Sequence, residues 1–175
     1  AVAVWSAHEF SRQLSRRISL ARRNRALEGK RSGGPIPYGM VDDGEGGLLP
    51  GDRAQVKIVR WMFEEFGERG RSLNAICKAL NKQGTPSPRG GRWTVAALKR
   101  ILANTAYRGD FTFNRNPRGE FFHIDGRGEV VEKERCEGHL LFLTPGRYEA
   151  IVEPALFDKV QARLDRVGGN RGLKG

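Results

Sequence analysis

Arginine and lysine side chains are the groups in this sequence whose chemistry stands out. Residues 1–35 carry eight basic and two acidic side chains, and residues 84–118 carry seven basic and one acidic, so each segment has a net charge of +6. Residues 36–83 are neutral and residues 119–175 carry −1, for a total of +11. Cationic side chains gathered in this way attract a polyanion, because they bind phosphate oxygens and the edges of guanine. Double-stranded DNA is the expected partner, and the alternatives are an acidic partner protein or a basic surface that serves only solubility.

Two groups of residues are the candidate DNA contacts. The first lies at the end of an expected helix and in the Gly- and Pro-rich stretch after it, which could enter a minor groove or act as a simple linker. The second lies in a loop and on the helix that follows it, from which side chains can reach base edges. Most of these contacts are expected to be to phosphates. The candidates are Arg22, Arg23, Arg25, Lys30 and Arg31 in the first group, and Arg89, Arg92, Thr94, Lys99 and Arg100 in the second.

The sequence points to no catalytic site, metal site or cofactor. Ser11, Ser15 and Ser19 lie beside arginines, but helical serines at such loose spacing are expected to be surface or interface residues. A structural zinc ion needs four ligands, usually in two close pairs. Cys136 and His139 form one such pair, so they are expected to be ordinary loop and strand residues.

The spacing of apolar residues predicts one helix over residues 5–28, which Gly29 ends. Phe10, Leu14 and Ile18 form a narrow apolar stripe on it, and arginines occupy the rest of its surface. A stripe this narrow is expected to contact a partner chain or another domain, with the arginine side outward.

Three short helices are expected to follow in succession. Asp52, Ser72 and Thr94 are their capping residues, and Gln55 completes a capping-box pattern with Asp52. Three short helices, the last entered from a basic loop, are typical of helix-turn-helix-like DNA-binding cores.

After Gly109 the apolar residues alternate, which is typical of strands, and a closing helix is expected from Pro154. The predicted fold class is α+β: a long N-terminal helix, a three-helix helix-turn-helix-like cluster, a small irregular antiparallel sheet and a closing C-terminal helix. The expected strands are residues 111–114, 121–124, 129–133, 139–143 and 148–152.

Composition excludes several classes of protein. The hydrophobic fraction is 38%, and no apolar run of about 18 residues could span a membrane. The N-terminus lacks the apolar core of a secretory signal, and two cysteines make no disulfide framework. The sequence begins without Met, so a fragment of a longer protein is expected.

A series of short motifs occurs in one order along the chain. They are PYG at 37–39, LNxxGxxxP at 80–88, WxxxxLxxILxN at 93–104 and YxG at 107–109. From about Gly34 to Leu164, the chain resembles the recombinase DNA-binding domain of the large serine recombinases, the phage integrase and transposon resolvase group.

The resemblance implies a division of labour. In that family a preceding domain carries the serine that forms a phosphoserine bond to DNA, the present domain reads part of the attachment site, and a zinc-ribbon domain that follows reads more of it. It implies sequence-specific duplex DNA binding in DNA integration or resolution, in a prokaryotic cytoplasm at the nucleoid, with no catalysis by this chain alone and with a homodimer or tetramer as the full-length form. The implied domains are a linker helix from a catalytic domain (1–29), the recombinase DNA-binding domain (30–167) and a tail or linker to a downstream domain (168–175). Two alternatives remain: a basic protein-interaction module without sequence-specific DNA binding, and a complete enzyme such as a nuclease.

Overall fold

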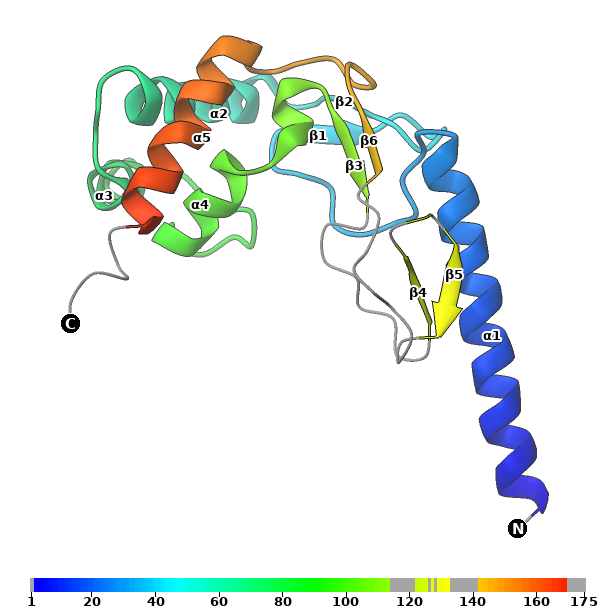
Figure 1. The fold of residues 1–175 in the computed structure, drawn as a ribbon. Coiled ribbons are helices and arrows are strands. Elements are labelled where there is room, and N and C mark those ends of the chain that lie inside the picture. Colours follow the sequence, from blue (N-terminus) through cyan, green and yellow to red (C-terminus); the bar gives the residue numbers. More distant parts are fainter. Residues whose placement is uncertain (1, 114–121, 126, 128, 133–141, 170–175) are drawn as a thin grey trace. The chain divides into compact units, whose positions relative to one another are not determined.

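The structure of the chain is a computed structural model. It describes residues 2–113, 122–125, 127, 129–132 and 142–169. Contacts divide the chain into two compact units, which are described separately here (Figure 1). The helix-and-hairpin unit holds Ala1–Gly34, Gly44–Gly47 and Phe111–Arg147, and the helical unit holds Pro35–Asp43, Leu48–Asp110 and Tyr148–Gly175.

The helix-and-hairpin unit is built on the long helix α1 and two pairs of antiparallel strands. In one pair Phe111 lies opposite Thr144, and in the other Phe122 lies opposite Glu132. Helix α1 runs along the second pair (Figure 1). Gly29 follows the helix with a φ of +67°, a conformation that glycine adopts without strain, so the expected stop is confirmed. The elements are α1 (Val2–Leu27), β3 (Phe111–Phe113), β4 (Phe122–Ile124), β5 (Val130–Glu132) and β6 (Phe142–Thr144).

The side of α1 that meets β4 and β5 is polar. Arg12 and Arg23 form ion pairs with Glu132 and Glu129, whereas the apolar stripe of α1 lies on another side and is exposed. The expectation that the arginine side points outward as a whole is therefore wrong for Arg12 and Arg23, because the hairpin offers carboxylates to them. The exposed fractions on the stripe are 68% for Phe10, 47% for Leu14 and 43% for Ile18.

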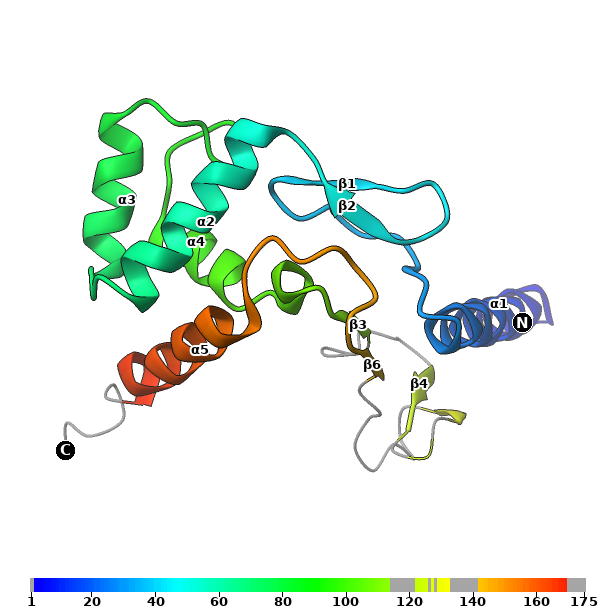
Figure 2. The same cartoon turned by 90° about the horizontal axis from the view of Figure 1, so that it is seen from above.

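The helical unit begins with a hairpin and continues as helices. Val41 lies opposite Leu49 in the hairpin, and four helices then gather into one cluster (Figure 2). The elements are β1 (Met40–Asp42), β2 (Leu48–Pro50), α2 (Arg53–Gly67), α3 (Leu73–Lys82), α4 (Val95–Leu102), the 3-10 turn η1 (Thr105–Arg108) and α5 (Pro154–Gly169).

The expected capping residues begin three of these helices. Ser72 accepts a hydrogen bond from Ala75 N and Thr94 accepts one from Ala97 N, both at 3.2 Å. Asp52 accepts from Gln55 N at 2.9 Å. The return half of the capping box differs, because the Gln55 side chain accepts from Gly39 N at 3.1 Å and so ties α2 to the chain before β1.

The core of the helical unit is apolar and fully buried. Phe63 lies at its centre, with its ring 6.0 Å from that of Tyr107 and 5.9 Å from that of Phe157. Gly67 allows α2 and α5 to approach closely, since a Cβ there would lie 2.8 Å from Leu156 and from Val160. The predicted buried stripes are confirmed: Val56, Val59, Phe63 and Phe66 on α2, Leu73, Ile76, Cys77 and Leu80 on α3, and Leu98, Ile101 and Leu102 on α4.

The strands confirm an α+β fold, but with smaller sheets than expected. Each described sheet has two strands. The expected strand at 148–152 is wrong, because its backbone N–H groups bond to carbonyls around η1 instead of to a neighbouring strand. Tyr148 N donates to Gly109 O at 2.8 Å, and Ile151 N and Val152 N both donate to Tyr107 O at 3.0 Å.

Candidate nucleic-acid interface

The loop between α3 and α4 carries the second group of candidates on a fixed framework. Trp93, at the end of the loop, is 3% exposed and meets Tyr38 edge to face at 5.4 Å. Its indole Nε1 donates to Thr85 O at 2.9 Å, which closes the loop onto its own beginning. Tyr107 holds Tyr38 in turn, because its hydroxyl donates to Tyr38 O at 2.9 Å. The buried aromatic residues thus set where the basic loop lies.

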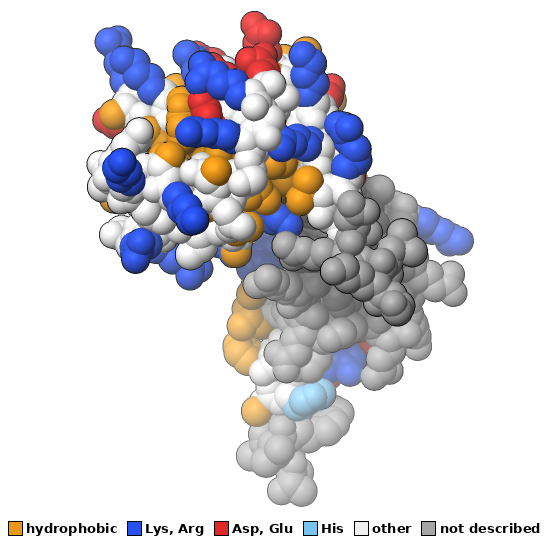
Figure 3. Space-filling model, turned by 90° about the vertical axis from the view of Figure 1, so that its left-hand side faces the viewer, with side chains coloured by type: hydrophobic (Ala, Val, Ile, Leu, Met, Phe, Trp, Pro, Cys, Tyr) orange, Lys and Arg blue, Asp and Glu red, His pale blue; other side chains and the backbone are white. Residues whose placement is uncertain are grey.

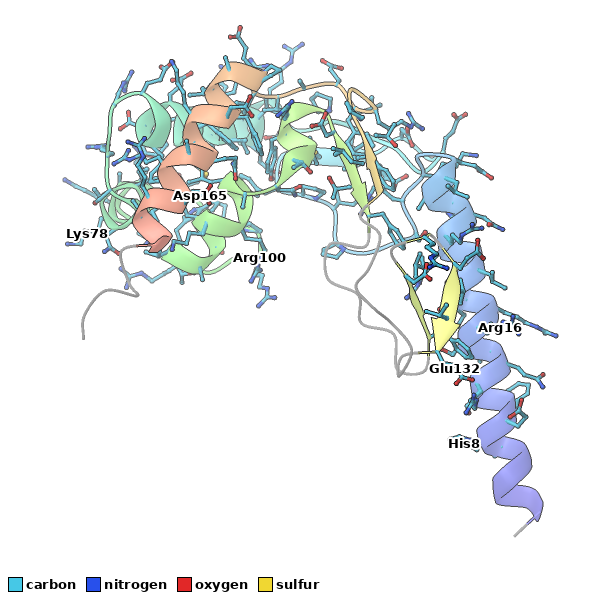
Figure 4. All side chains as sticks on the ribbon, viewed as in Figure 1. His8, Arg16, Lys78, Arg100, Glu132 and Asp165 are labelled. Carbon is cyan, nitrogen blue, oxygen red and sulfur yellow. The ribbon has the colours of Figure 1, made fainter. Side chains whose placement is uncertain are left out.

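The basic side chains of this loop and of α4 face solvent. Arg89, Arg92 and Arg100 are exposed and Lys99 is half-buried. Among the described residues, none of the four is paired with a carboxylate. Figure 4 shows Arg100 projecting from α4 away from the other helices of the unit. Cations without an internal partner are available to bind an anion, and these four lie within twelve residues of chain.

Thr94 differs from the other candidates. Its Oγ1 accepts the Ala97 N–H as the N-cap of α4, although the residue itself is exposed. The hydroxyl therefore retains its own proton to donate, and a phosphate oxygen is a suitable acceptor.

Two lysines of α3 are further exposed cations of the helical unit that were not among the candidates. Lys78 and Lys82 are exposed, and within the described part of the chain neither is paired with a carboxylate. Lys78 projects from α3 in Figure 4, and Lys and Arg side chains are spread over the face of the helical unit shown in Figure 3. The signal in the sequence was available, because both lysines fall outside the apolar stripe of α3.

The first group of candidates lies in the helix-and-hairpin unit, and the structure brings two of its members together. Arg22 and Arg31 line a cleft of about 300 Å³ with Ser32, Gly33 and Gly34, and β3 forms another of its walls. Arg31 donates to Gly34 O at 3.1 Å, so the guanidinium also supports the bend of the chain. The cleft thus combines two cations with a hydroxyl group and exposed glycines.

The other three members of this group have partners within the unit. Arg25 donates to Arg31 O at 3.0 Å, and its charge adds to that of Lys30 in lowering the pKa of Glu28. Arg23 lies 3.3 Å from Glu129, and Lys30 lies 2.8 Å from Glu28. The hydrogen bond and charge of Lys30 lower the pKa of Glu28 below its usual value. A DNA phosphate would have to replace a carboxylate at Arg23 and at Lys30, but not at Arg25.

Burial raises the pKa of three side chains in the helical unit. Burial raises the pKa of Tyr107, with a smaller effect from Tyr38. It also raises the pKa of Tyr38, to which the charge of Asp52 adds. Burial raises the pKa of the Cys77 thiol, so this group stays protonated at neutral pH and is a poor nucleophile. These residues are structural.

The structure offers no metal centre within the described residues, where no three His, Cys, Asp or Glu side chains gather. Cys136 and His139 lie outside those residues. None of the described helices is both long enough and apolar enough to cross a membrane.

Comparison with known proteins bears on the fold and the family. The Recombinase family model matches residues 53–167. The crystal structure of an LSR–DNA complex is similar, with a TM-score of 0.55 and 20% identity over 87% of this chain and 38% of that chain. A structure from work on the sequence requirements of the Listeria innocua prophage attP site has a TM-score of 0.56 and 20% identity, over 87% of this chain and 52% of that one. No curated protein matches the sequence at a significant level.

The chain thus spans less than two thirds of the length of either similar structure. The family match covers all four helices of the helical unit, including the basic loop and α4. It confirms the resemblance carried by the LNxxGxxxP and WxxxxLxxILxN motifs, which fall inside the matched residues. The chain belongs to the Recombinase family.

Proposed function

We propose that this chain binds duplex DNA in a sequence-specific manner, as the attachment-site-recognition domain of a serine site-specific recombinase. The observation that carries the proposal is the set of exposed cations on a rigid support, from Arg89 to Arg100, with no carboxylate partner among the described residues. A helix entered from a basic loop is suited to a major groove, where Arg and Lys read guanine. Both similar structures come from work on DNA, one of them as a complex.

The ten candidates divide by role. Arg92 and Arg100 are the proposed base contacts, because Arg92 lies just before the N-cap of α4, Arg100 lies in its last turn, and both are exposed. The remaining candidates are proposed phosphate or minor-groove contacts, which set register and carry most of the salt dependence. They are Arg22, Arg23, Arg25, Lys30, Arg31, Arg89, Thr94 and Lys99.

The proposal extends to the parent protein. Residues 1–29 would join a catalytic domain to the DNA-binding domain at 30–167, and 168–175 would lead to a downstream domain. Strand exchange through a phosphoserine link would belong to the catalytic domain, so this chain alone would not cleave DNA. The full-length protein would act as a dimer or tetramer on DNA in a prokaryotic cytoplasm.

A selection experiment tests this function. The chain is used to select duplexes from a random pool, and its affinity for the selected duplex is compared with that for a scrambled one at 150 mM salt. Arg92→Ala and Arg100→Ala should each weaken binding to the selected duplex by about 1–3 kcal/mol if they read bases. Arg166→Ala is the matched control, because Arg166 is an exposed arginine of α5 whose Nε donates to Ala162 O of its own helix and which is not a candidate contact.

Equal binding to both duplexes would contradict the proposal and favour the alternative, a basic module that binds an acidic protein. An unchanged affinity in both arginine variants would remove α4 from the interface. Cleavage of supercoiled plasmid by the chain alone would favour the remaining alternative, a complete nuclease.

A further inference from the structure

The Asn81 side chain is bonded in both directions to the main chain of Trp93. Its Nδ2 donates to Trp93 O at 3.0 Å, and Trp93 N donates to its Oδ1 at 2.7 Å. Asn81 lies in the last turn of α3, twelve residues before Trp93. Two antiparallel hydrogen bonds to one residue restrict its orientation as well as its position. The carboxamide therefore acts on Trp93 as a neighbouring strand would.

The loop that Asn81 clamps is closed at several points. Near its start, the carbonyl of Thr85 accepts the indole N–H of Trp93 at 2.9 Å. In its middle, Ser87 N donates to Gly91 O at 3.1 Å and Gly90 N donates to Ser87 O at 2.8 Å. The loop is a small closed structure whose far end is attached to α3 through Asn81.

The clamped residue lies between two candidate DNA contacts. Arg92 directly precedes Trp93, and Thr94, the N-cap of α4, directly follows it. The side chain of Asn81 is half-buried and carries no charge, and both ends of its carboxamide are bonded to the main chain of Trp93. Its contribution to binding is therefore expected to come through the residues that it holds.

We infer that Asn81 is a positioning residue for sequence readout, which acts by fixing Arg92 and the first turn of α4 before DNA arrives. This inference rests on the proposed function. A preorganised group binds without the entropic cost of being ordered on contact, and a base contact needs one geometry, whereas a phosphate contact tolerates several. Loss of the clamp should therefore reduce selectivity more than general affinity for DNA.

The first test compares Asn81→Ala with Asn74→Ala, using the whole chain. Asn74 is an exposed asparagine of the same helix for which the described part of the chain provides no hydrogen-bond partner. Asn81→Ala should lose roughly tenfold in affinity for the selected duplex, with little change for the scrambled one, and Asn74→Ala should change neither. Circular dichroism at the assay temperature tests whether each variant is folded. Equal selectivity in the two variants would overturn the inference.

A double-mutant cycle separates positioning from a purely structural role. If Asn81 acts through Arg92, Asn81→Ala should have little further effect on selectivity once Arg92→Ala is present. A structural role predicts additive losses, and additive losses would overturn the inference. The chain without substitutions reports on the proposed function itself, because a wild-type chain that prefers neither duplex refutes that function before any variant is compared.

A second variant covers the case in which Asn81→Ala does not fold. Asn81→Asp keeps the shape of the side chain and the acceptor for Trp93 N, but it removes the Nδ2 donor to Trp93 O. It breaks one half of the clamp, so it should lower the ratio of the affinities for the selected and the scrambled duplex in the same direction as Asn81→Ala. A folded Asn81→Asp chain with the wild-type ratio would also overturn the inference.

Discussion

Replacement of Glu129 by Gln should increase the affinity of the chain for DNA. Arg23 is a candidate contact whose guanidinium lies 3.3 Å from the Glu129 carboxylate, so a phosphate that binds it competes with that carboxylate. Glu129 is 68% exposed and Arg23 25%, and an ion pair this exposed contributes about 0.2–1 kcal/mol. Removal of the competitor should lower Kd by a factor of about 1.4 to 5.

Fluorescence anisotropy with a labelled duplex measures this gain, and two variants control for the change in net charge. Glu149→Gln removes one exposed carboxylate from the helical unit, where no arginine of the first group lies. Glu132→Gln releases Arg12, which is not a candidate contact. The gain in DNA affinity should be larger for Glu129→Gln than for either control variant. The difference between them should become smaller at higher salt, because salt screens the charges.

The same reasoning fails if Glu129→Gln binds DNA no more tightly than the two controls. The prediction is also contradicted if the gain persists when Arg23 is replaced by Ala, because the gain then does not come from that guanidinium.

Three further predictions concern the framework. Leu98→Ala, at a side chain with no exposed surface, should lower the free energy of unfolding by about 2–5 kcal/mol in urea titrations, and a smaller loss would mean that α4 repacks. Gly109→Ala should cost more stability than Gly70→Ala: both glycines have a positive φ, but a Cβ at 109 would lie 2.7 Å from Tyr148 O, whereas a Cβ at 70 meets open space. Equal losses would refute the close approach at 109. Because burial raises the pKa of Tyr107 in the folded chain, its stabilising effect is complete below the unfolded value of about 10 and is lost as pH rises through 10 toward the folded pKa. Urea titrations at pH 9 and pH 11 should therefore show a smaller loss of stability for Tyr107→Phe than for wild type, and equal losses would contradict this.

The helices could be predicted from the local sequence. Ser72 and Thr94 cap α3 and α4 as expected, because a cap joins residues only two or three positions apart. The apolar stripes of the helical unit could also be predicted, since helical spacing determines which residues share a face.

The strands were harder to predict from the sequence, and the segment 148–152 shows why. Alternation over this segment would bury Tyr148, Ala150 and Val152 together, but Ala150 is exposed, whereas Ile151 is buried with Tyr148 and Val152. The N–H groups of the three buried residues bond to carbonyls around η1. Neither the buried side chains nor the backbone partners of the N–H groups could be read from the alternation, because both depend on where η1 packs.

In the candidate site, too, some features could be predicted from the sequence and others depended on the tertiary structure. Charge counts locate the two basic segments, because net charge depends on composition alone. The pairing of Arg23 with a carboxylate 106 positions away and the clamp of Asn81 on Trp93 depend on long-range packing. Sequence alone determined the helices, their caps, the basic segments and the family resemblance, since each is carried by residues close together in the chain. Only the tertiary structure decided that Arg12 and Arg23 are paired with carboxylates and that the loop before α4 is rigid, because Glu132 and Glu129 lie more than a hundred positions from their arginines and Asn81 lies on another helix.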